Sequence, residues 1–361
     1  MRIFLISNMY PTEEAPIYGV FVGNFVKAFE KLGVRFSRMA VITNPTASLL
    51  KKVGKYIRFY LSICKGVFAR DYDIIYAHFI FHSAIGLYFL LPFINKPIIM
   101  NAHGSDVLND SKIYKVLLKW FVKPVLRKAK YVVVPSTYFR ELMVDEIGIE
   151  ESKVVIYPSG GVNTEMFKPE GHAPIHEQTI FGYISRITSG KGYNIFLKAI
   201  NYLKNEYPNL RFNAVIVGSG TEEPEMKKYI SLNKLESIVK IFPSANQEKL
   251  LGYFYMMDCF VFPTIRKQES LGLIGLEAMA CGRPVIGSDI GGLKDYIKDE
   301  INGYKFEPGN YKELGERMKC FIVMNNDKRA ELVQNALDTA KEFDKEIVSM
   351  KLINILSDIL K

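Results

Sequence analysis

The chain has 361 residues, more than the roughly 250–300 at which a single hydrophobic core stops growing, so two domains are expected. Hydrophobic residues make up 48% and charged residues 24%, which excludes a disordered or collagen-like chain, and four cysteines without a CxxC motif exclude a disulfide scaffold and a cysteine-based zinc site. The net charge is +9, of which +8 falls in residues 1–170, and this favours an anionic partner such as a nucleic acid, a phosphorylated ligand or a membrane surface.

The first half of the chain alternates short apolar segments with helical patterns. A helix is expected from Val20 to Leu32, where Gly33 ends it. Strands are expected at Arg2–Ser7, Phe36–Ile42, Ile74–Ala77, Ile98–Asn101, Tyr131–Val134 and Val154–Tyr157.

Two segments of the first half hold most of its positive charge. Leu49–Arg70 and Lys112–Lys130 contain six and seven basic residues and no acidic ones, interleaved with apolar side chains. This pattern is typical of helices that lie on an anionic membrane surface, although a solvated basic face over an ordinary core stripe is the alternative. The longest apolar run, Ser83–Ile94, is too short for a membrane span of about 20 residues, and the N-terminal apolar stretch is too short for a signal peptide. We therefore expect a cytoplasmic protein, peripheral on the inner face of the membrane.

The second half repeats the alternation. Strands are expected at Thr179–Ile184, Arg211–Val217, Val239–Phe242, Cys259–Phe262 and Pro284–Gly287, and residues from Tyr311 onward read as helical. Strands that are apolar on both faces and alternate with helices predict parallel sheets, and two such sets predict two doubly wound α/β domains. The Pro- and Gly-rich segment Pro158–Gly161 with Pro169–Pro174 is the expected connection, which gives domains of residues 1–165 and 166–343 followed by a C-terminal helix at 344–361.

Glycine-rich turns follow several strands of the second half. Ser185-Arg186 and Lys191-Gly192 follow the strand that ends at Ile184, and Gly218-Ser219-Gly220 follow Val217. Such turns at helix N-termini suit phosphate groups, and Arg186 and Lys191 add positive charge. No P-loop motif is present, and the glycines do not complete a dinucleotide-binding GxGxxG.

Two glutamates around one apolar helix require an explanation. Glu277 is the only charged residue between Leu271 and Gly282, so it is expected to be buried, either in an ion pair with a neighbouring strand or as an acceptor for ligand hydroxyls. Glu269 lies in the preceding loop, as a solvated loop acid or as part of the same site.

Polar residues also follow the strands of the first half. His103 lies in a glycine-containing cluster, Asn101–Asp106, which fits a site, whereas Ser105 or Asp106 could simply cap the next element. His78 and His82 read as partly buried structural histidines. Asp71 and Asp73 form a DxD pattern, but they precede their strand and so lie away from the ligand side.

The combination of these motifs resembles the family-4 retaining glycosyltransferases of the GT-B fold, in which two Rossmann-like domains with parallel sheets face each other across a cleft. The resemblance covers most of the chain. The matching segments are Met9–Pro11 with Tyr18–Phe21, Asn101–Asp106, Pro158–Pro169, Ser185-Arg186, Lys191-Gly192, Val217–Gly220, and above all Glu269–Val285, which is similar to the EX7E motif and its AMAxGxPV tail. The first loop differs, because many members have adjacent glycines where this chain has Gly19 alone.

The resemblance implies a nucleotide-sugar donor on the second domain and an acceptor on the first, with closure of the cleft excluding water and the C-terminal helix crossing back to the first domain. Glu277 would bind the ribose, and Glu269 with the backbone of Ser270–Leu273 the sugar and a phosphate. The catalytic residues it implies are His103, Arg186, Lys191 and Glu269, and the donor-binding residues are Gly19, Ser185, Gly218, Ser244, Asn246, Ser270, Leu271, Gly272, Leu273 and Glu277.

The expected reaction is therefore transfer of a hexosyl or N-acetylhexosaminyl group to a hydroxyl of a lipid-linked or polysaccharide precursor, with retention and without a metal or other cofactor. Positively charged groups of the protein beside the leaving diphosphate would stabilise the transition state. Two alternatives remain open: a nucleotide-sugar 2-epimerase of the same architecture, and a nucleic-acid-binding module that uses the basic first half. No nucleic-acid-binding motif supports the second alternative, so no nucleic-acid partner is expected.

Overall fold

The structure is a computed structural model that describes residues 1–46, 48–104, 106–108, 111–170 and 178–361. The chain forms two compact units. Unit 1 comprises Met1–Gly161 and Lys345–Lys361, and unit 2 comprises Val162–Asp344. Ser105 and residues 171–174 of the expected connection lie outside the described residues.

Unit 1 is built on a six-stranded parallel sheet with the strand order β2-β1-β3-β4-β5-β6. Its strands are β1 (Arg2–Tyr10), β2 (Arg35–Thr43), β3 (Ile74–His78), β4 (Ile98–Asn101), β5 (Tyr131–Val134) and β6 (Val154–Ile156). The chain runs outward from β1 to β2 and then returns to the other side of β1 as β3. The sheet therefore has a point between β1 and β3 where consecutive connections leave in opposite directions, which is where open α/β sheets bind ligands.

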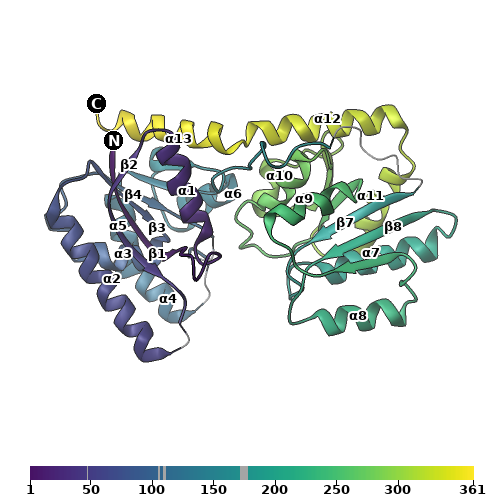
Figure 1. Ribbon diagram of the computed structural model, residues 1–361, viewed down its shortest axis with the longest axis horizontal. Coiled ribbons are helices and arrows are strands. Elements are labelled where there is room, and N and C mark those ends of the chain that lie inside the picture. The colour runs from purple at the N-terminus through teal and green to yellow at the C-terminus, as the bar shows by residue number, and fades with distance from the viewer. Residues whose placement is uncertain (47, 105, 109–110, 171–177) are drawn as a thin grey trace. The chain divides into compact units, whose positions relative to one another are not determined.

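Helices cover both faces of this sheet because its strands are apolar on both sides. Ile3 and Leu5 of β1 share one core with α1 (Val20–Lys31) and α13 (Lys345–Asp358), which lie side by side (Figure 1). Phe4 and Ile6 face the opposite core. The helical segments of that second layer are α2 (Leu49–Ala69), α3 (Ile80–Tyr88), η1 (Leu91–Phe93), α4 (Lys112–Leu117), η2 (Leu118–Val122), α5 (Lys123–Lys128), α6 (Thr137–Glu141) and η3 (Leu142–Glu146), with η4 (Glu151–Lys153) before β6.

Unit 2 is a second parallel six-stranded sheet, with the order β12-β11-β10-β7-β8-β9. Its strands are β7 (Thr179–Ile184), β8 (Phe212–Val217), β9 (Val239–Phe242), β10 (Cys259–Phe262), β11 (Val285–Ser288) and β12 (Gly303–Phe306). The helical segments are α7 (Tyr193–Glu206), α8 (Glu223–Leu232), α9 (Gln247–Tyr255), α10 (Leu273–Ala280), η5 (Gly291–Asp295), α11 (Tyr311–Ile322) and α12 (Asn326–Glu342). Here the connections diverge between β7 and β10.

Side-chain alternation along β8 again separates two cores. Ala214 and Ile216 pack with α7, α8 and α11, whereas Val215 and Val217 pack with α9, α10 and α12. The two parallel sheets confirm the expected α/β class with two doubly wound folds. Strand β12 was not expected from the sequence: it is a four-residue edge strand that begins with a glycine and pairs with one neighbouring strand, β11. Within the described residues, no helix is both long enough and apolar enough to cross a membrane.

Candidate functional site

In unit 2, the loops after β7 and β10 meet at the point where the connections diverge. The β7–α7 turn contains Gly190 and Gly192, both with positive φ. A Cβ atom on Gly192 would lie 1.9 Å from the carbonyl oxygen of Pro263, which follows β10, so only glycine lets the two loops approach this closely. The close approach brings the charged residues of both loops together.

Lys191 and Glu269 form an ion pair across these loops. The Lys191 Nζ and Glu269 Oε2 atoms are 2.6 Å apart, and each side chain is only 15% exposed. The sequence predicts both residues in one site, but their ion pair was not expected. In this pair the ammonium group lies at the divergence point of the sheet, where an anionic group of a ligand could compete with Glu269 for it.

The start of α10 lies directly after Glu269 and Ser270. Its N-cap residue, Gly272, has φ 78° and offers no side chain to accept a hydrogen bond from the first turn. The first N–H groups of a helix have no acceptor within the helix, and no acidic residue occupies this first turn, so α10 presents donors and a positive dipole end. Leu271 is fully buried and Tyr296 donates a hydrogen bond from its hydroxyl to the Gly272 carbonyl, which holds the turn in place.

Glu277 lies one turn further into α10 and is buried, with 8% of its surface exposed. Burial raises the pKa of its carboxyl to about 7. A hydrogen bond from Gln247 Nε2 to Glu277 Oε1, 3.4 Å long, has the opposite effect and lowers this pKa. Within the described part of the chain, Glu277 forms no ion pair, so the structural alternative of an ion pair with a strand is not observed. Gln247 was missed by the sequence analysis, although it directly follows Asn246, which was expected near the ligand.

The other expected residues of unit 2 surround this centre on neighbouring loops. Ser185 is half-buried and Arg186 exposed after β7, and a Cβ on Gly218 after β8 would lie 1.9 Å from the Ser185 carbonyl oxygen. Ser244 and Asn246 follow β9. The Ser244 backbone N–H donates to the Ser219 hydroxyl, and the Asn246 side-chain oxygen caps α9 by accepting the Lys249 N–H at 3.1 Å. This oxygen therefore has a structural role, whereas the Asn246 amide nitrogen does not take part in the cap.

In unit 1, the expected residues Gly19 and His103 follow the carboxyl ends of β1 and β4. Gly19 caps α1 with φ 73°, and a Cβ there would lie 2.7 Å from the Met9 carbonyl carbon, which explains why this position is a glycine. His103 is half-buried and packs against the rings of Phe21 and Phe79, whose centroids lie 4.6 and 4.8 Å from its own.

Asp106 organises the loop that carries His103. Its carboxylate accepts the His103 backbone N–H at 2.8 Å and the Ile80 N–H at 2.9 Å, so it joins the loops after β3 and β4. Burial raises the pKa of Asp106 to about 6, against the effect of these hydrogen bonds. Asp106 therefore does more than cap one element.

The DxD pattern does not contribute to either set of site residues. Asp71 and Asp73 lie at the amino end of β3, where Asp71 accepts from Arg38 at 2.6 Å and Asp73 from Arg2 at 2.8 Å. These hydrogen bonds from arginine hold the pKa of both carboxyls below its usual range. Among the residues that the structure describes, no three His, Cys, Asp or Glu side chains gather as metal ligands.

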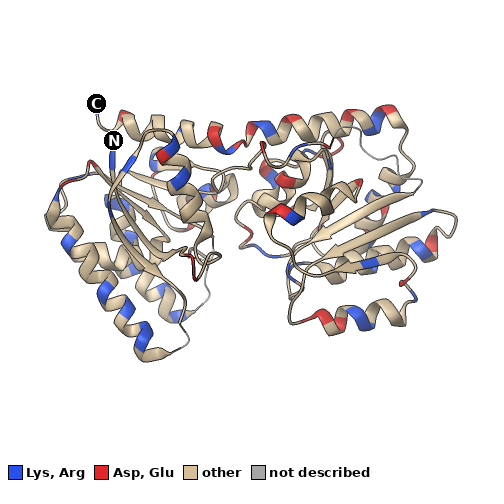
Figure 2. Cartoon of the chain, viewed as in Figure 1, with Lys and Arg blue, Asp and Glu red and all other residues tan. Residues whose placement is uncertain are grey.

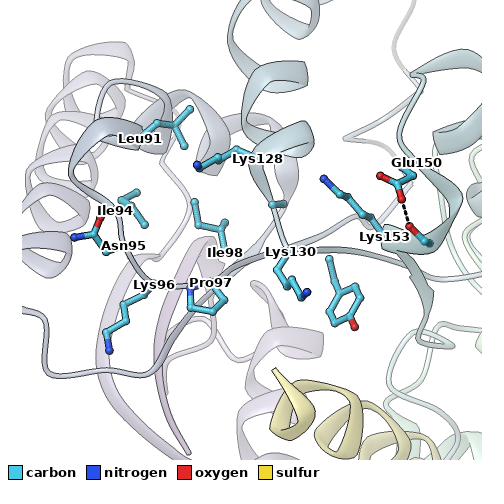
Figure 3. Close-up of a pocket in the computed structure, with 13 residues that line it drawn as sticks. Leu91, Ile94, Asn95, Lys96, Pro97, Ile98, Lys128, Lys130, Glu150 and Lys153 are labelled. Carbon is cyan, nitrogen blue, oxygen red and sulfur yellow. Dashed lines mark hydrogen bonds between the residues drawn. The ribbon is translucent and has the colours of Figure 1, made fainter. Parts of the chain in front are cut away.

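A cavity of about 810 Å³ lies at the opposite edge of the unit 1 sheet, at the amino ends of β4, β5 and β6. Lys96, Lys128, Lys130 and Lys153 line it together with Glu150 (Figure 3). None of the expected site residues does so. Because Gly19 and His103 follow the carboxyl ends of their strands, this cavity is separate from them.

Comparison with known protein families gives two matches that together span most of the chain. A family model described as Glycosyl transferases group 1 matches residues 165–339, and one described as Glycosyltransferase Family 4 matches residues 20–165. These two segments include every expected site residue of unit 2 and His103 of unit 1.

Individual relatives are more distant. An uncharacterized glycosyltransferase of Methanocaldococcus jannaschii is 26% identical over 277 residues, 76% of this chain and 72% of that protein. A D-inositol 3-phosphate glycosyltransferase of Arthrobacter is 34% identical over 123 residues, which cover 34% of this chain but only 29% of that protein. Among solved structures, HepE from Anabaena in complex with UDP has the same fold, with a TM-score of 0.76 and 19% identity over 99% of this chain and 100% of that one.

Proposed function

This chain belongs to the group 1 and family 4 glycosyltransferases, and we propose that it moves a hexosyl or N-acetylhexosaminyl group from a nucleoside-diphosphate sugar to a hydroxyl group, with retention of the anomeric configuration. The observation that carries the proposal is the Lys191–Glu269 pair at the divergence point of the unit 2 sheet, directly before the uncapped start of α10. A cation, a carboxylate and free helix N–H groups together suit a diphosphate attached to a sugar with several hydroxyls.

We assign the donor contacts as follows. Lys191 and Arg186 contact the diphosphate, and the Glu269 carboxylate accepts sugar hydroxyls once the phosphate takes over Lys191. Glu277 accepts the ribose hydroxyls. Among the described residues, its buried carboxylate accepts a side-chain hydrogen bond from Gln247 alone, so the ribose supplies the further donors that it lacks. The remaining donor-binding residues that we propose are Gly19, Ser185, Gly218, Ser244, Asn246, Ser270, Leu271, Gly272 and Leu273, with His103 near C6 of the sugar. HepE binds UDP, which supports a nucleoside diphosphate as the leaving group.

The proposed chemistry breaks the bond between the anomeric carbon and the diphosphate oxygen and forms a bond to the acceptor oxygen on the same face. Lys191, Arg186 and the start of α10 stabilise the negative charge that develops on the leaving diphosphate, the role that a metal ion has in other transferases. A phosphate oxygen takes the proton of the acceptor hydroxyl. Glu269 binds the sugar and does not attack the anomeric carbon, because its carboxylate accepts the sugar hydroxyls.

The helical layer of unit 1 that contains α2, α3, η1, α4 and η2 supports a further proposal. We propose that the acceptor is lipid-linked and lies in an anionic membrane, and that the protein binds the cytoplasmic face of that membrane. Half of the large hydrophobic residues that are exposed in the described part of the chain belong to this layer. Figure 2 shows basic residues and no acidic ones along α2. The exposed side chains are Leu49, Leu50, Val53, Ile57, Leu61, Phe68, Phe89, Phe93, Ile113, Val116 and Trp120.

The proposal is tested by transfer assays with UDP-, GDP- and ADP-sugars on a panel of alkyl glycosides, with and without excess EDTA. We expect one donor class to be used, full activity in EDTA, and an anomeric proton coupling in the product that matches the donor's configuration by NMR. Loss of activity on chelation or an inverted linkage would refute the mechanism. A change at C2 of the donor sugar without any acceptor would instead identify an epimerase.

A further inference from the structure

His78 is a buried histidine that the proposed reaction does not use. It is the last residue of β3, is 1% exposed, and places its Nδ1 atom 2.9 Å from the Nε2 atom of His103. The two rings lie edge to edge and nearly in one plane, with centroids 5.1 Å apart and an interplanar angle of 25°. The pair therefore joins the carboxyl ends of the adjacent strands β3 and β4 through a single hydrogen bond.

The rest of the His78 ring has an apolar environment. Phe25 of α1 packs against it edge to face at 4.6 Å, and its Nε2 atom has no hydrogen-bond partner among the described residues. Two other titratable groups contact the pair: Tyr76, in ring contact with His78, and Asp106, which accepts the His103 backbone N–H. A buried ring nitrogen without a hydrogen-bond partner lowers the stability of a folded protein. The presence of a histidine calls for a reason other than stability.

The hydrogen bond determines how His103 can meet a ligand. Burial lowers the pKa of both imidazoles, that of His103 to about 3, so both rings are neutral near pH 7 and each carries one N–H. A single proton lies between His78 Nδ1 and His103 Nε2, so the tautomers of the two rings are coupled. Because His103 Nε2 is engaged by His78, Nδ1 is the ring nitrogen that remains for a ligand.

We propose that His78 is a positioning residue that fixes the ring orientation and the tautomer of His103, so that His103 presents Nδ1 to its ligand. The rings of Phe21 and Phe79 pack against the His103 ring, and His78 supplies the directional contact that ring packing lacks. The pairing itself is independent of the function proposed above. Its effect on sugar transfer rests on that function.

The test uses three variants of the full chain. The side-chain amide of His78→Asn can replace the Nδ1 atom, the amide of His78→Gln is placed like the other ring nitrogen, and His78→Leu removes the hydrogen bond. Long-range 15N NMR of the imidazoles is feasible because the chain has only five histidines. Without any donor, we expect separate Nδ1 and Nε2 shifts for His103, typical of one tautomer, in the unaltered protein and in His78→Asn. We expect shifts averaged between two tautomers in His78→Leu and His78→Gln.

Transfer kinetics give the second readout. We expect kcat to fall by about 10- to 100-fold in His78→Leu with KM for the donor little changed, and His78→Asn to recover most of the loss. Thermal midpoints are measured in parallel, because a loss of kcat in a variant that keeps its thermal midpoint reflects positioning and not a loss of stability. His103 shifts that are identical in all variants would overturn the inference. Altered shifts with unaltered kcat would leave the pairing intact and refute the proposed role of His103 in transfer.

Discussion

At the scale of single residues, the ion pair at the centre of unit 2 gives a direct test of the donor site. Lys191→Ala removes the charge that we assign to the diphosphate and leaves Glu269 without its partner. Since a hydrogen bond to a charged group contributes about 1.5–3 kcal/mol, nucleoside diphosphate binding should weaken roughly 10- to 150-fold. Calorimetric titration measures the effect.

The matched control for this variant is Lys228→Ala, an exposed lysine on α8 of the same unit. It should leave diphosphate binding unchanged, because it removes the same charge away from the β7 and β10 loops. Equal binding by the unaltered protein and Lys191→Ala would remove Lys191 from the diphosphate site.

The buried carboxyl of Glu277 should make the free energy of unfolding depend on pH. Burial raises its carboxyl pKa to about 7, above the 4.5 of an unperturbed glutamate, so between these pH values the folded protein binds the proton more tightly than the unfolded chain. The free energy of unfolding therefore falls as pH rises through this window. Glu277→Gln cannot ionise, and its stability relative to the unaltered protein should rise by about 2–3 kcal/mol from pH 5 to pH 8. Denaturant unfolding at the two pH values measures this difference.

The same substitution should affect ligand binding in the opposite sense. An amide offers the ribose hydroxyls a weaker acceptor than a carboxylate, so Glu277→Gln should bind nucleoside diphosphate less well at pH 8 despite its greater stability. A variant that binds as well as the unaltered protein at pH 8 would show that Glu277 has only a structural role.

At the scale of an element, helix α2 differs from an ordinary surface helix because it exposes apolar residues beside basic ones. Val53, Ile57 and Leu61 are each more than half exposed and recur every four residues, so they form one stripe along the helix, beside basic residues and without a single acid. A helix that only covered a core would direct such a stripe inward. The buried residues of α2, including Phe59 and Ile63, occupy another face.

This arrangement predicts binding to anionic vesicles but not to neutral ones. Each basic residue near such a surface contributes about 1 kcal/mol, so Lys51→Gln with Arg58→Gln should lower vesicle binding by roughly 30-fold, and added salt should weaken it. Co-sedimentation measures the partition. Ile57→Ser, in the exposed stripe of α2, should also reduce binding. Its control is Leu232→Ser, at an exposed position of α8 in unit 2, which should leave binding unchanged. Absence of salt-sensitive co-sedimentation would refute the membrane proposal.

At the scale of the whole molecule, the chain leaves unit 1 after Gly161 and returns to it at Lys345. Helix α13 then completes a core of unit 1: Leu352 and Leu356 are buried against residues of α1 and β1. The stability of unit 1 thus depends on residues 345–361, which are synthesised after the whole of unit 2.

Substitution of Leu352 should therefore destabilise one unit. Leu352→Ala creates a cavity in the unit 1 core and should cost about 2–5 kcal/mol, whereas Leu360→Ala, at an exposed position near the chain end, should cost little. Hydrogen exchange followed by mass spectrometry separates the units: protection should fall in β1 and α1 and remain in β7 and β10. Equal loss of protection in both units would show that they unfold together.

The amino-acid sequence by itself determined the α/β class, the two sets of parallel strands and the family, because these depend on local patterns. Strands that are apolar on both faces can only be buried in covered sheets, and glycines with charged residues after the strands mark the ligand edge of such sheets. The segment Glu269–Val285 carried the family resemblance. Short edge strands such as β12 give too weak a pattern to be found in this way.

Only the tertiary structure decided which side chains touch. The pairing of Lys191 with Glu269 depends on strand order, since β7 and β10 are neighbours although 78 residues separate the two side chains. The hydrogen bond between His78 and His103 likewise depends on the register of β3 against β4, which brings their carboxyl ends together. Local sequence contains no information on such register, because it is set by the packing of whole helices and sheets.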